Sequence, residues 1–318
     1  MLLVRKKASR AIEVLALSAI IILLIVYVFC FGFHFPIYRD GGLWVRLKMD
    51  DTHLSPSMIL ALRNSPVAVP GQFSWRESSP GFQVGELPAL VHGNVVDRIL
   101  LARIDPTRFR FGVYNHSRGY RTLDQWMRKL GAALVVNGSY FSPGWKPATP
   151  LLSNGRLLGP TEYDRKGGVF SAAKGVAKVQ DLINQGWRTA FEGMTAGLVS
   201  FPILINGSYY DQNKTRWLAN RSFIGQDKSG WIIIGTTVDA FFSLDRLAMF
   251  LHESPLELTM ALNLDGGPVA CQAIQLDGFE RKTYGKWEMR IDDDDALLLM
   301  SLRGIPPAMP VVIAVFPK

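Results

Sequence analysis

Cysteine is almost absent from this chain of 318 residues, and this scarcity limits how the fold can be held together. The two cysteines are Cys30, inside a long apolar stretch near the N-terminus, and Cys271, far downstream. The apolar stretch that contains Cys30 is long enough to lie within a membrane, which would separate Cys30 from Cys271. No disulfide is therefore expected between the two cysteines. The hydrophobic core must therefore stabilise the fold, and a content of 48% hydrophobic residues is sufficient for one.

The sequence also lacks the spacing of metal ligands. The histidines show no paired placement of the zinc type; they are His34, His53, His92, His116 and His252. The acidic run at 292–295 lacks the alternating ligand spacing of a calcium loop, so a solvated turn is favoured there. We predict no metal site and no cofactor.

Acidic side chains are fewer than basic ones, and the net charge is +8. This excess of positive charge does not indicate a nucleic-acid partner. Four of the positive charges precede the apolar stretch and the others are scattered, without a basic stripe interleaved with aromatics. A nucleic-acid partner is therefore not expected.

A long apolar stretch is present. Residues 14–33 contain no charged side chain, and a helix of this length spans a hydrocarbon core of roughly 30 Å. The stretch follows Arg5, Lys6, Lys7 and Arg10, and the positive-inside tendency then predicts a cytoplasmic N-terminus. We predict a cytoplasmic tail at 1–13, a transmembrane anchor at 14–35, and a periplasmic or extracellular position for all that follows. A cleaved signal peptide is the alternative, although no small-residue cleavage site follows the stretch.

Beyond the anchor the pattern changes twice. Residues 36–94 are rich in proline and are predicted to form a juxtamembrane connector or a substrate-side flap, with one short helix at 56–64. From 95 to 318, short runs rich in β-formers alternate with glycine and asparagine turns. The expected strands are 99–104, 109–114, 132–136, 168–171, 197–205, 223–225, 231–236, 258–264, 269–275 and 310–316. Helices are expected at 122–130 and 243–253, each opened by Thr or Ser. The predicted fold class is α+β, with a mixed or antiparallel sheet core and flanking helices.

The most informative local feature is an acid at the end of a buried strand. The expected strand 258–264 ends in Asn263 and Leu264, and Asp265, Gly266 and Gly267 follow. Two glycines leave open space beside the carboxylate, where a ligand can approach.

Two other apolar strands end in Asn-Gly. In one, Asn137 and Gly138 are followed by Tyr140 and Phe141, which offer a flat apolar face. The other, at 206–207, is explained by a hairpin turn.

Seven short segments, taken in chain order, carry a resemblance. They are Ile104-Asp105-Pro106, Asn137-Gly138-Ser139-Tyr140-Phe141, Gly168-Val169-Phe170, Pro202-Ile203-Leu204-Ile205-Asn206-Gly207, Asn220-Arg221-Ser222-Phe223-Ile224-Gly225, Ser243-Leu244-Asp245-Arg246-Leu247-Ala248 and Asn263-Leu264-Asp265-Gly266-Gly267. Together they resemble the phosphodiester glycosidase domain family, whose namesake removes N-acetylglucosamine from mannose 6-phosphate diesters. The resemblance covers about residues 95–318.

The resemblance implies one pocket lined by three of these segments. The site residues that it indicates are Asn137, Gly138, Tyr140 and Phe141, then Arg221, then Asn263, Asp265, Gly266 and Gly267. Cleavage of a sugar C1–O bond builds positive charge on the sugar, which Asp265 can stabilise or attack. The forked guanidinium of Arg221 suits the anionic leaving phosphate. Asn137 and Asn263 can hydrogen-bond sugar hydroxyls, and Tyr140 can stack on the ring.

Two questions stay open at this point. The candidates for a second, acid/base carboxylate are Glu192, Asp239 and Asp277. The chain also departs from the family pattern after Gly267, where Pro268, Val269 and Ala270 replace glycine and serines. The expected function is a membrane-anchored extracytoplasmic hydrolase of sugar 1-phosphodiester or related glycosidic bonds in envelope or exported glycans. The alternative is a catalytically inactive glycan-binding or assembly component of exopolysaccharide or envelope biogenesis.

Overall fold

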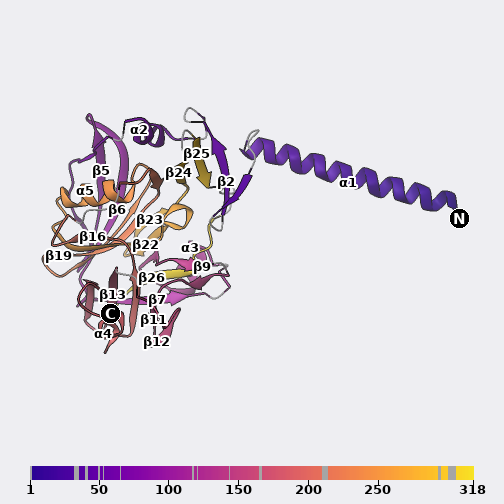
Figure 1. Ribbon diagram of the computed structural model, residues 1–318. Coiled ribbons are helices and arrows are strands. Elements are labelled where there is room, and N and C mark those ends of the chain that lie inside the picture. Colours follow the sequence, from indigo (N-terminus) through magenta and orange to yellow (C-terminus); the bar gives the residue numbers. More distant parts are fainter. Residues whose placement is uncertain are drawn as a thin grey trace.

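The computed structural model describes residues 2–31, 36–39, 42–48, 51–52, 54–64, 66–116, 118–119, 121–142, 144–164, 167–209, 214–292, 295–299 and 306–318. Helix α1 (Leu2–Phe31) extends away from a β-rich body (Figure 1). Its segment Ile12–Phe29 has a mean hydropathy of 2.8 and is not buried. This length and composition suit a signal sequence or a membrane anchor. The predicted anchor extends to residue 35, and positions 32–35 lie outside the described residues.

The largest sheet has nine strands in the order β17-β16-β21-β19-β20-β6-β5-β3, with β4 also paired to β5. Its strands are β3 (Val69–Pro70), β4 (Arg76–Ser79), β5 (Phe82–Val91), β6 (Asn94–Ile104), β16 (Ile203–Asn206), β17 (Ser208–Tyr209), β19 (Ser222–Asp227), β20 (Ile232–Thr237) and β21 (Leu258–Asn263). Neighbours run antiparallel, as in the registers of β5 with β6 and of β19 with β21.

Three further sheets have five strands each. The first, in the order β1-β2-β25-β24-β18, contains β1 (Pro36–Arg39), β2 (Gly42–Leu47), β18 (Trp217–Ala219), β24 (Glu288–Asp292) and β25 (Asp295–Leu299). The second, in the order β23-β22-β8-β26-β7, contains β7 (Phe109–Asn115), β8 (Leu134–Asn137), β22 (Gln272–Leu276), β23 (Phe279–Thr283) and β26 (Val311–Pro317). The third, in the order β12-β11-β15-β13-β14, contains β11 (Leu151–Ser153), β12 (Arg156–Leu158), β13 (Gly168–Ala173), β14 (Val176–Asp181) and β15 (Ala196–Ser200). A small hairpin pairs β9 (Phe141–Ser142) with β10 (Lys146–Pro147).

The helices of the body are short. They are α2 (Pro56–Asn64), α3 (Leu123–Leu130), α4 (Trp187–Phe191), α5 (Leu244–His252) and the 3₁₀ turn η1 (Gly267–Val269). A reciprocal capping box starts α3, because the Thr122 hydroxyl accepts from the Gln125 N–H and the Gln125 side chain accepts from the Thr122 N–H. Ser243 stands at the N-cap of α5 but makes no side-chain cap bond. The architecture is therefore mostly antiparallel sheet with few helices.

Two expected strands differ from the structure. The run at 197–205 is divided into β15 and β16, with the cis Phe201–Pro202 peptide bond between them. Proline lacks the N–H that would continue a strand ladder, which explains the interruption. The run at 269–275 begins as the turn η1, with Pro268 near its start, and becomes strand only at Gln272.

The proline-rich segment 36–94, expected as a connector, contributes strands to two sheets. Strand β5 pairs with β6 from Phe82↔Ile104 to Val91↔Asn94. Pro88 lies inside β5, and its carbonyl still accepts a hydrogen bond from the Gly71 N–H at 2.8 Å. A proline can therefore lie inside a strand at a position where the neighbouring strand does not need its N–H as a hydrogen-bond donor.

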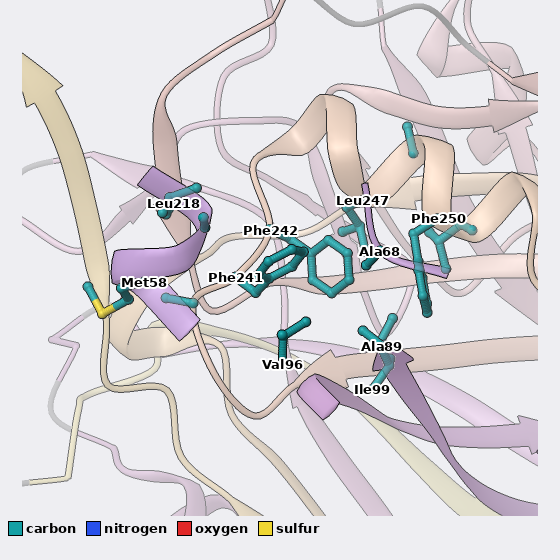
Figure 2. Packing of buried hydrophobic residues seen from close by; sticks show 14 of the residues in the cluster. Met58, Ala68, Ala89, Val96, Ile99, Leu218, Phe241, Phe242, Leu247 and Phe250 are labelled. Carbon is teal, nitrogen blue, oxygen red and sulfur yellow. The ribbon is translucent and has the colours of Figure 1, made fainter. Parts of the chain in front are cut away.

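The nine-stranded sheet has core on both faces. On β20, Ile233 faces a cluster formed with α2 and α5, whereas Ile232 and Ile234 face a second cluster shared with β7, β8 and β26. Figure 2 shows the first cluster, in which Phe241 and Phe242 meet with their ring centroids 5.2 Å apart. Burial on both faces explains why β20 opens with three consecutive apolar residues, Ile232 to Ile234, instead of alternating apolar and polar ones.

Candidate active site

Two of the three predicted segments, the one at Asn137 and the one at Asp265, meet where β8 and β21 end. Strand β8 ends at Asn137, and its Nδ2 donates to the Asp265 carbonyl at 2.7 Å. The Asp265 N–H in turn donates to the Gly138 carbonyl at 3.0 Å. Gly138 must lack a side chain, because a Cβ there would lie 2.5 Å from a methyl carbon of Val311. Strand ends from two different sheets therefore position the Asp265 backbone.

Tyr140 and Asn263 are joined to each other. The Asn263 Nδ2 donates to the Tyr140 hydroxyl at 2.7 Å, and that hydroxyl donates to the Phe201 carbonyl at 2.7 Å. The Tyr140 ring also stacks on the Phe201 ring, with centroids 4.5 Å apart. Burial and the nearby Asp265 raise the pKa of Tyr140, so the phenol stays protonated and acts as a fixed donor.

The amides of Asn137 and Asn263 keep unused acceptors. Both Nδ2 groups are spent on protein partners, whereas both Oδ1 atoms are buried and have no hydrogen-bond partner in the described part of the chain. Unpaired buried acceptors are uncommon and call for a hydrogen-bond donor that the described residues do not supply. Sugar hydroxyls are such donors.

Arg221 approaches Asp265 from the segment between β18 and β19. Its side chain is 7% exposed, and it donates from Nε to the Phe242 carbonyl at 3.3 Å and from Nη2 to the Trp217 carbonyl at 2.7 Å. The third nitrogen, Nη1, faces Gly266, where a Cβ would lie 3.4 Å away. Within the described residues Nη1 has no hydrogen-bond partner. Two bonds thus fix the guanidinium and leave one donor edge for an anion.

A second carboxylate, that of Glu288, belongs to this group and was not predicted from the sequence. Glu288 begins β24, opposite Ala219 of β18, and its Oε1 accepts a bond from Trp217 Nε1 at 3.0 Å. Its other oxygen faces Gly267, where an added Cβ would overlap it. Gly267 also has φ +67, which disfavours side chains. The second glycine after Asp265 is therefore required both by the backbone and by Glu288.

The charges in this site influence one another. Burial, and then the neighbouring Glu288, raise the pKa of Asp265 to about 7, against the opposing effects of the Gly266 N–H and Arg221. Burial also raises the pKa of Glu288, while Arg221 and the Trp217 bond oppose the rise. Burial lowers the pKa of Arg221, and Glu288 is the largest of the anionic groups that oppose this. Asp265 and Glu288 thus compete for protons beside one cation.

The other candidate carboxylates lie elsewhere. Glu192 is exposed at the C-cap of α4, and Asp277 is exposed in the turn between β22 and β23. Asp239 accepts from the Ser55 hydroxyl and the Ala240 N–H. Phe141 lies in β9 and stacks on Trp145, with centroids 5.4 Å apart.

Only a weak signal in the sequence marks Glu288. It follows Gly285, Lys286 and Trp287, and Gly285 packs so closely on the η1 turn that a Cβ there would overlap the Gly267 carbonyl. A glycine and a tryptophan ahead of an acid are compatible with a site, but many strands begin in this way.

No group of three or more His, Cys, Asp or Glu side chains that could hold a metal ion occurs within the described ranges.

Comparisons with known proteins identify the family and the fold. The model of the phosphodiester glycosidase family matches residues 130–296, just over half of the chain. The catalytic domain of zebrafish N-acetylglucosamine-1-phosphodiester alpha-N-acetylglucosaminidase, solved in a form autoinhibited by its pro-peptide, is similar in fold: 17% identity, 80% of this chain and 85% of that chain covered, and a TM-score of 0.52.

A putative exported protein from Burkholderia pseudomallei also shares the fold, at 9% identity, with 81% of this chain and 99% of that chain covered and a TM-score of 0.51. No match is found among curated proteins. The segments that form the site lie within the matched range, and the chain belongs to the phosphodiester glycosidase family.

Proposed function

We propose that the protein hydrolyses a sugar 1-phosphodiester bond, or a closely related glycosidic bond, in an envelope or exported glycan. The observation that carries this proposal is the grouping of Asp265, Glu288 and Arg221, with Nη1 of the arginine left for an anion. Family membership implies a carbohydrate substrate. A phosphodiester places an anion directly beside the C1–O bond, and this arrangement matches a cation beside two carboxylates.

The reaction adds one water across the bond between C1 and the bridging oxygen. The bond breaks as positive charge develops at C1, and the electron pair leaves with the phosphate, whose oxygens Arg221 neutralises. A carboxylate of the Asp265–Glu288 pair stabilises the positive charge, and the pair accepts a proton from the incoming water. The products are the free sugar and a phosphate monoester, to which the proton is returned.

The remaining site residues suit recognition of the sugar. The unpaired Oδ1 atoms of Asn137 and Asn263 accept bonds from hydroxyl groups. The Tyr140 hydroxyl, held between Asn263 and Phe201, keeps the amide of Asn263 in place. These three residues therefore act as a preorganised frame around the carboxylate pair.

We further propose that α1 anchors the protein and that the β-rich body works on the periplasmic or extracellular side. The charges before the apolar segment support this orientation. Envelope glycans are then within reach of the site.

The test uses the full-length protein in detergent and a synthetic sugar 1-phosphodiester. Release of free sugar and phosphate monoester in equal amounts is expected, and Asp265→Asn should lower kcat at least about a hundredfold. Asp164→Asn, at an exposed position, is the matched control and should keep full activity. Glycan binding without turnover on diesters and glycosides would replace this proposal with that of an inactive glycan-binding or assembly component.

A further inference from the structure

A second basic region lies beside the proposed site. A groove of about 510 Å³ runs along α3 and is lined by His116, Arg121, Gln125, Arg128 and Lys129. The lining residues at 121, 125, 128 and 129 are spaced to share one helix face, opposite the buried face of Leu123, Trp126 and Met127. The groove thus carries three permanent positive charges and a histidine, and none of the described residues that line it is a carboxylate.

Helix stabilisation accounts for only part of this charge. Arg128 and Lys129 lie in the last turn of α3, where cations complement the helix dipole. Arg121 instead precedes the N-cap, at the positive end of the dipole, where a cation is disfavoured. Its guanidinium is held over the Trp126 ring, 4.6 Å from the centroid. The one acid of α3, Asp124, is engaged by the Tyr284 hydroxyl and by Lys282.

His116 adds an imidazole ring to the lining of the groove. Its ring packs edge-on against Trp126, and its Nδ1 is buried. Burial and the cations Arg121, Arg118 and Lys129 lower the pKa of His116. A phosphate in the groove would compensate this surrounding positive charge.

The groove begins at the same end of the sheet as the active site. The His116 N–H donates to the Pro310 carbonyl, and the Gly138 N–H donates to the Val311 carbonyl, both at 2.8 Å. Residues 116 and 138 follow β7 and β8, which flank β26, so their backbones lie roughly 10 Å apart, two strand spacings. This separation is on the scale of a short glycan.

Aromatic rings connect the two regions. Phe141, in the segment that follows Gly138, stacks on Trp145. The Trp145 ring packs directly on Gly119, where an added Cβ would overlap it, and Gly119 lies two residues before Arg121. A sugar between the two anion positions would therefore meet flat apolar surface, which sugar rings favour.

We propose that the α3 groove binds a second phosphate of the same glycan chain whose bond is cleaved at Asp265, so that the substrate is a repeating sugar-phosphate polymer. This inference rests on the proposed function, because it assigns the polymer to that site.

The test compares two synthetic substrates, one with a single sugar 1-phosphodiester and one with a second phosphodiester further along the chain. With the full-length protein we expect the second phosphate to lower KM about tenfold. The double variant Arg128→Gln/Lys129→Gln should abolish most of that advantage, and Arg121→Gln should reduce it also. The control Lys174→Gln/Lys178→Gln removes two exposed charges from the β13–β14 hairpin and should preserve it.

Three results would overturn the proposal: no advantage of the second phosphate, an advantage unaffected by Arg128→Gln/Lys129→Gln, or one lost equally in the lysine control. The same comparison in nanodiscs of neutral and of anionic lipid separates the phosphate sources. An advantage abolished by anionic lipid would assign the groove to lipid headgroups instead. If neither substrate is cleaved, the proposed function fails. The groove is then tested by comparing the Kd values of two non-hydrolysable phosphonate analogues, one with and one without the second phosphate position.

Discussion

The Asp265–Glu288 pair determines how the site responds to pH. Asp265 has a pKa of about 7 because its charged form is buried and lies near a second carboxylate. Two acids that repel one another across a desolvated site together hold less negative charge than the two would hold if they were far apart. The pair thus has a proton acceptor near neutral pH, where a general base is most effective.

Glu288→Gln tests this coupling. The substitution keeps the shape of the side chain and removes the negative charge that raises the pKa of Asp265. Asp265 should then lose its proton at lower pH, and the limb of the kcat/KM pH profile that reports it should move toward acid. We also expect kcat to fall about 10²- to 10⁴-fold, as for loss of an acid/base group.

Glu280→Gln, at an exposed position of β23, is the matched control and should leave both rate and profile unchanged. An unshifted limb in Glu288→Gln, or one that moves toward alkali, would show that the two carboxylates are not coupled as described.

Gly267 is constrained both by its backbone conformation and by the space beside it, and a substitution tests both constraints. A substitution to alanine meets two costs, the φ of +67 and an overlap with the Glu288 carboxylate. Gly193 has a similar φ of +70, but nothing lies within 4 Å of an added Cβ, so Gly193→Ala measures the backbone cost alone. We expect Gly193→Ala to lower the free energy of unfolding by about 1 kcal/mol and Gly267→Ala by clearly more.

Denaturant titration of the two alanine variants gives the comparison. Gly267→Ala should also lose activity, because Glu288 must move to make room. Equal stability losses in the two variants would mean that the loop and Glu288 relax without cost.

At the scale of elements, Asn220 joins the segments that carry the site residues. Its Oδ1 accepts from the Lys286 and Trp287 N–H groups at the start of β24, and its Nδ2 donates to the carbonyls of Thr237 and Asp239. Its own carbonyl accepts from the Gly267 N–H at 2.9 Å. One fully buried amide thus fixes where Arg221, Glu288 and η1 lie relative to one another.

Asn220→Ala should therefore disturb both stability and catalysis. It leaves the Lys286 and Trp287 N–H groups and the Thr237 carbonyl without their side-chain partner in a buried place, at a cost of about 3 kcal/mol or more, whereas the Asp239 carbonyl keeps its bond from the Thr237 hydroxyl. Asn206→Ala, which removes the single bond to Asp181, should cost about 1 kcal/mol or less. Denaturant titration and kcat of both variants provide the measurement. A stability loss in Asn220→Ala no larger than that in Asn206→Ala would contradict the assigned bonds.

Patterns along the chain were sufficient to predict most helices and strands but not how the strands pair into sheets. Helix α2 has the predicted bounds, and α3 and α5 begin within one residue of prediction, because caps and apolar periodicity are local signals. The hairpin at 206–207 is confirmed by the pairing of β16 with β17. Strand β5 was missed because prolines are read as breaks, and whether a neighbour uses the missing N–H is not a local property.

The same distinction holds for the site. Asn137 and Asn263 end β8 and β21, and Asp265 follows β21 just before Gly266, so each of these positions can be recognised within its own short segment. Glu288 becomes part of the group only because β24 pairs with β18, which places it beside Trp217 and opposite η1. Pairing between strands about 70 residues apart has no local signature, so this carboxylate required the structure.

At the scale of the whole molecule, α1 is the segment whose length and composition suit a signal sequence or a membrane anchor. Its apolar segment is exposed along its length, as suits a helix surrounded by lipid, and the body buries a complete core without it. A signal sequence would be cleaved and the body released, whereas an anchor would remain attached. The two cases differ in mass and in fractionation.

We expect the anchor. The full-length chain should stay in the membrane pellet after an alkaline carbonate wash, because about 18 apolar residues leave a bilayer only at great cost. In sealed cells, external protease should degrade the body once the outer barrier is opened and spare the N-terminal tail, as the positive-inside tendency requires. Mass measurement of the mature N-terminus completes the test. A soluble body lacking its first 30 or so residues would identify α1 as a signal sequence instead, and the site would then act on glycans away from the membrane surface.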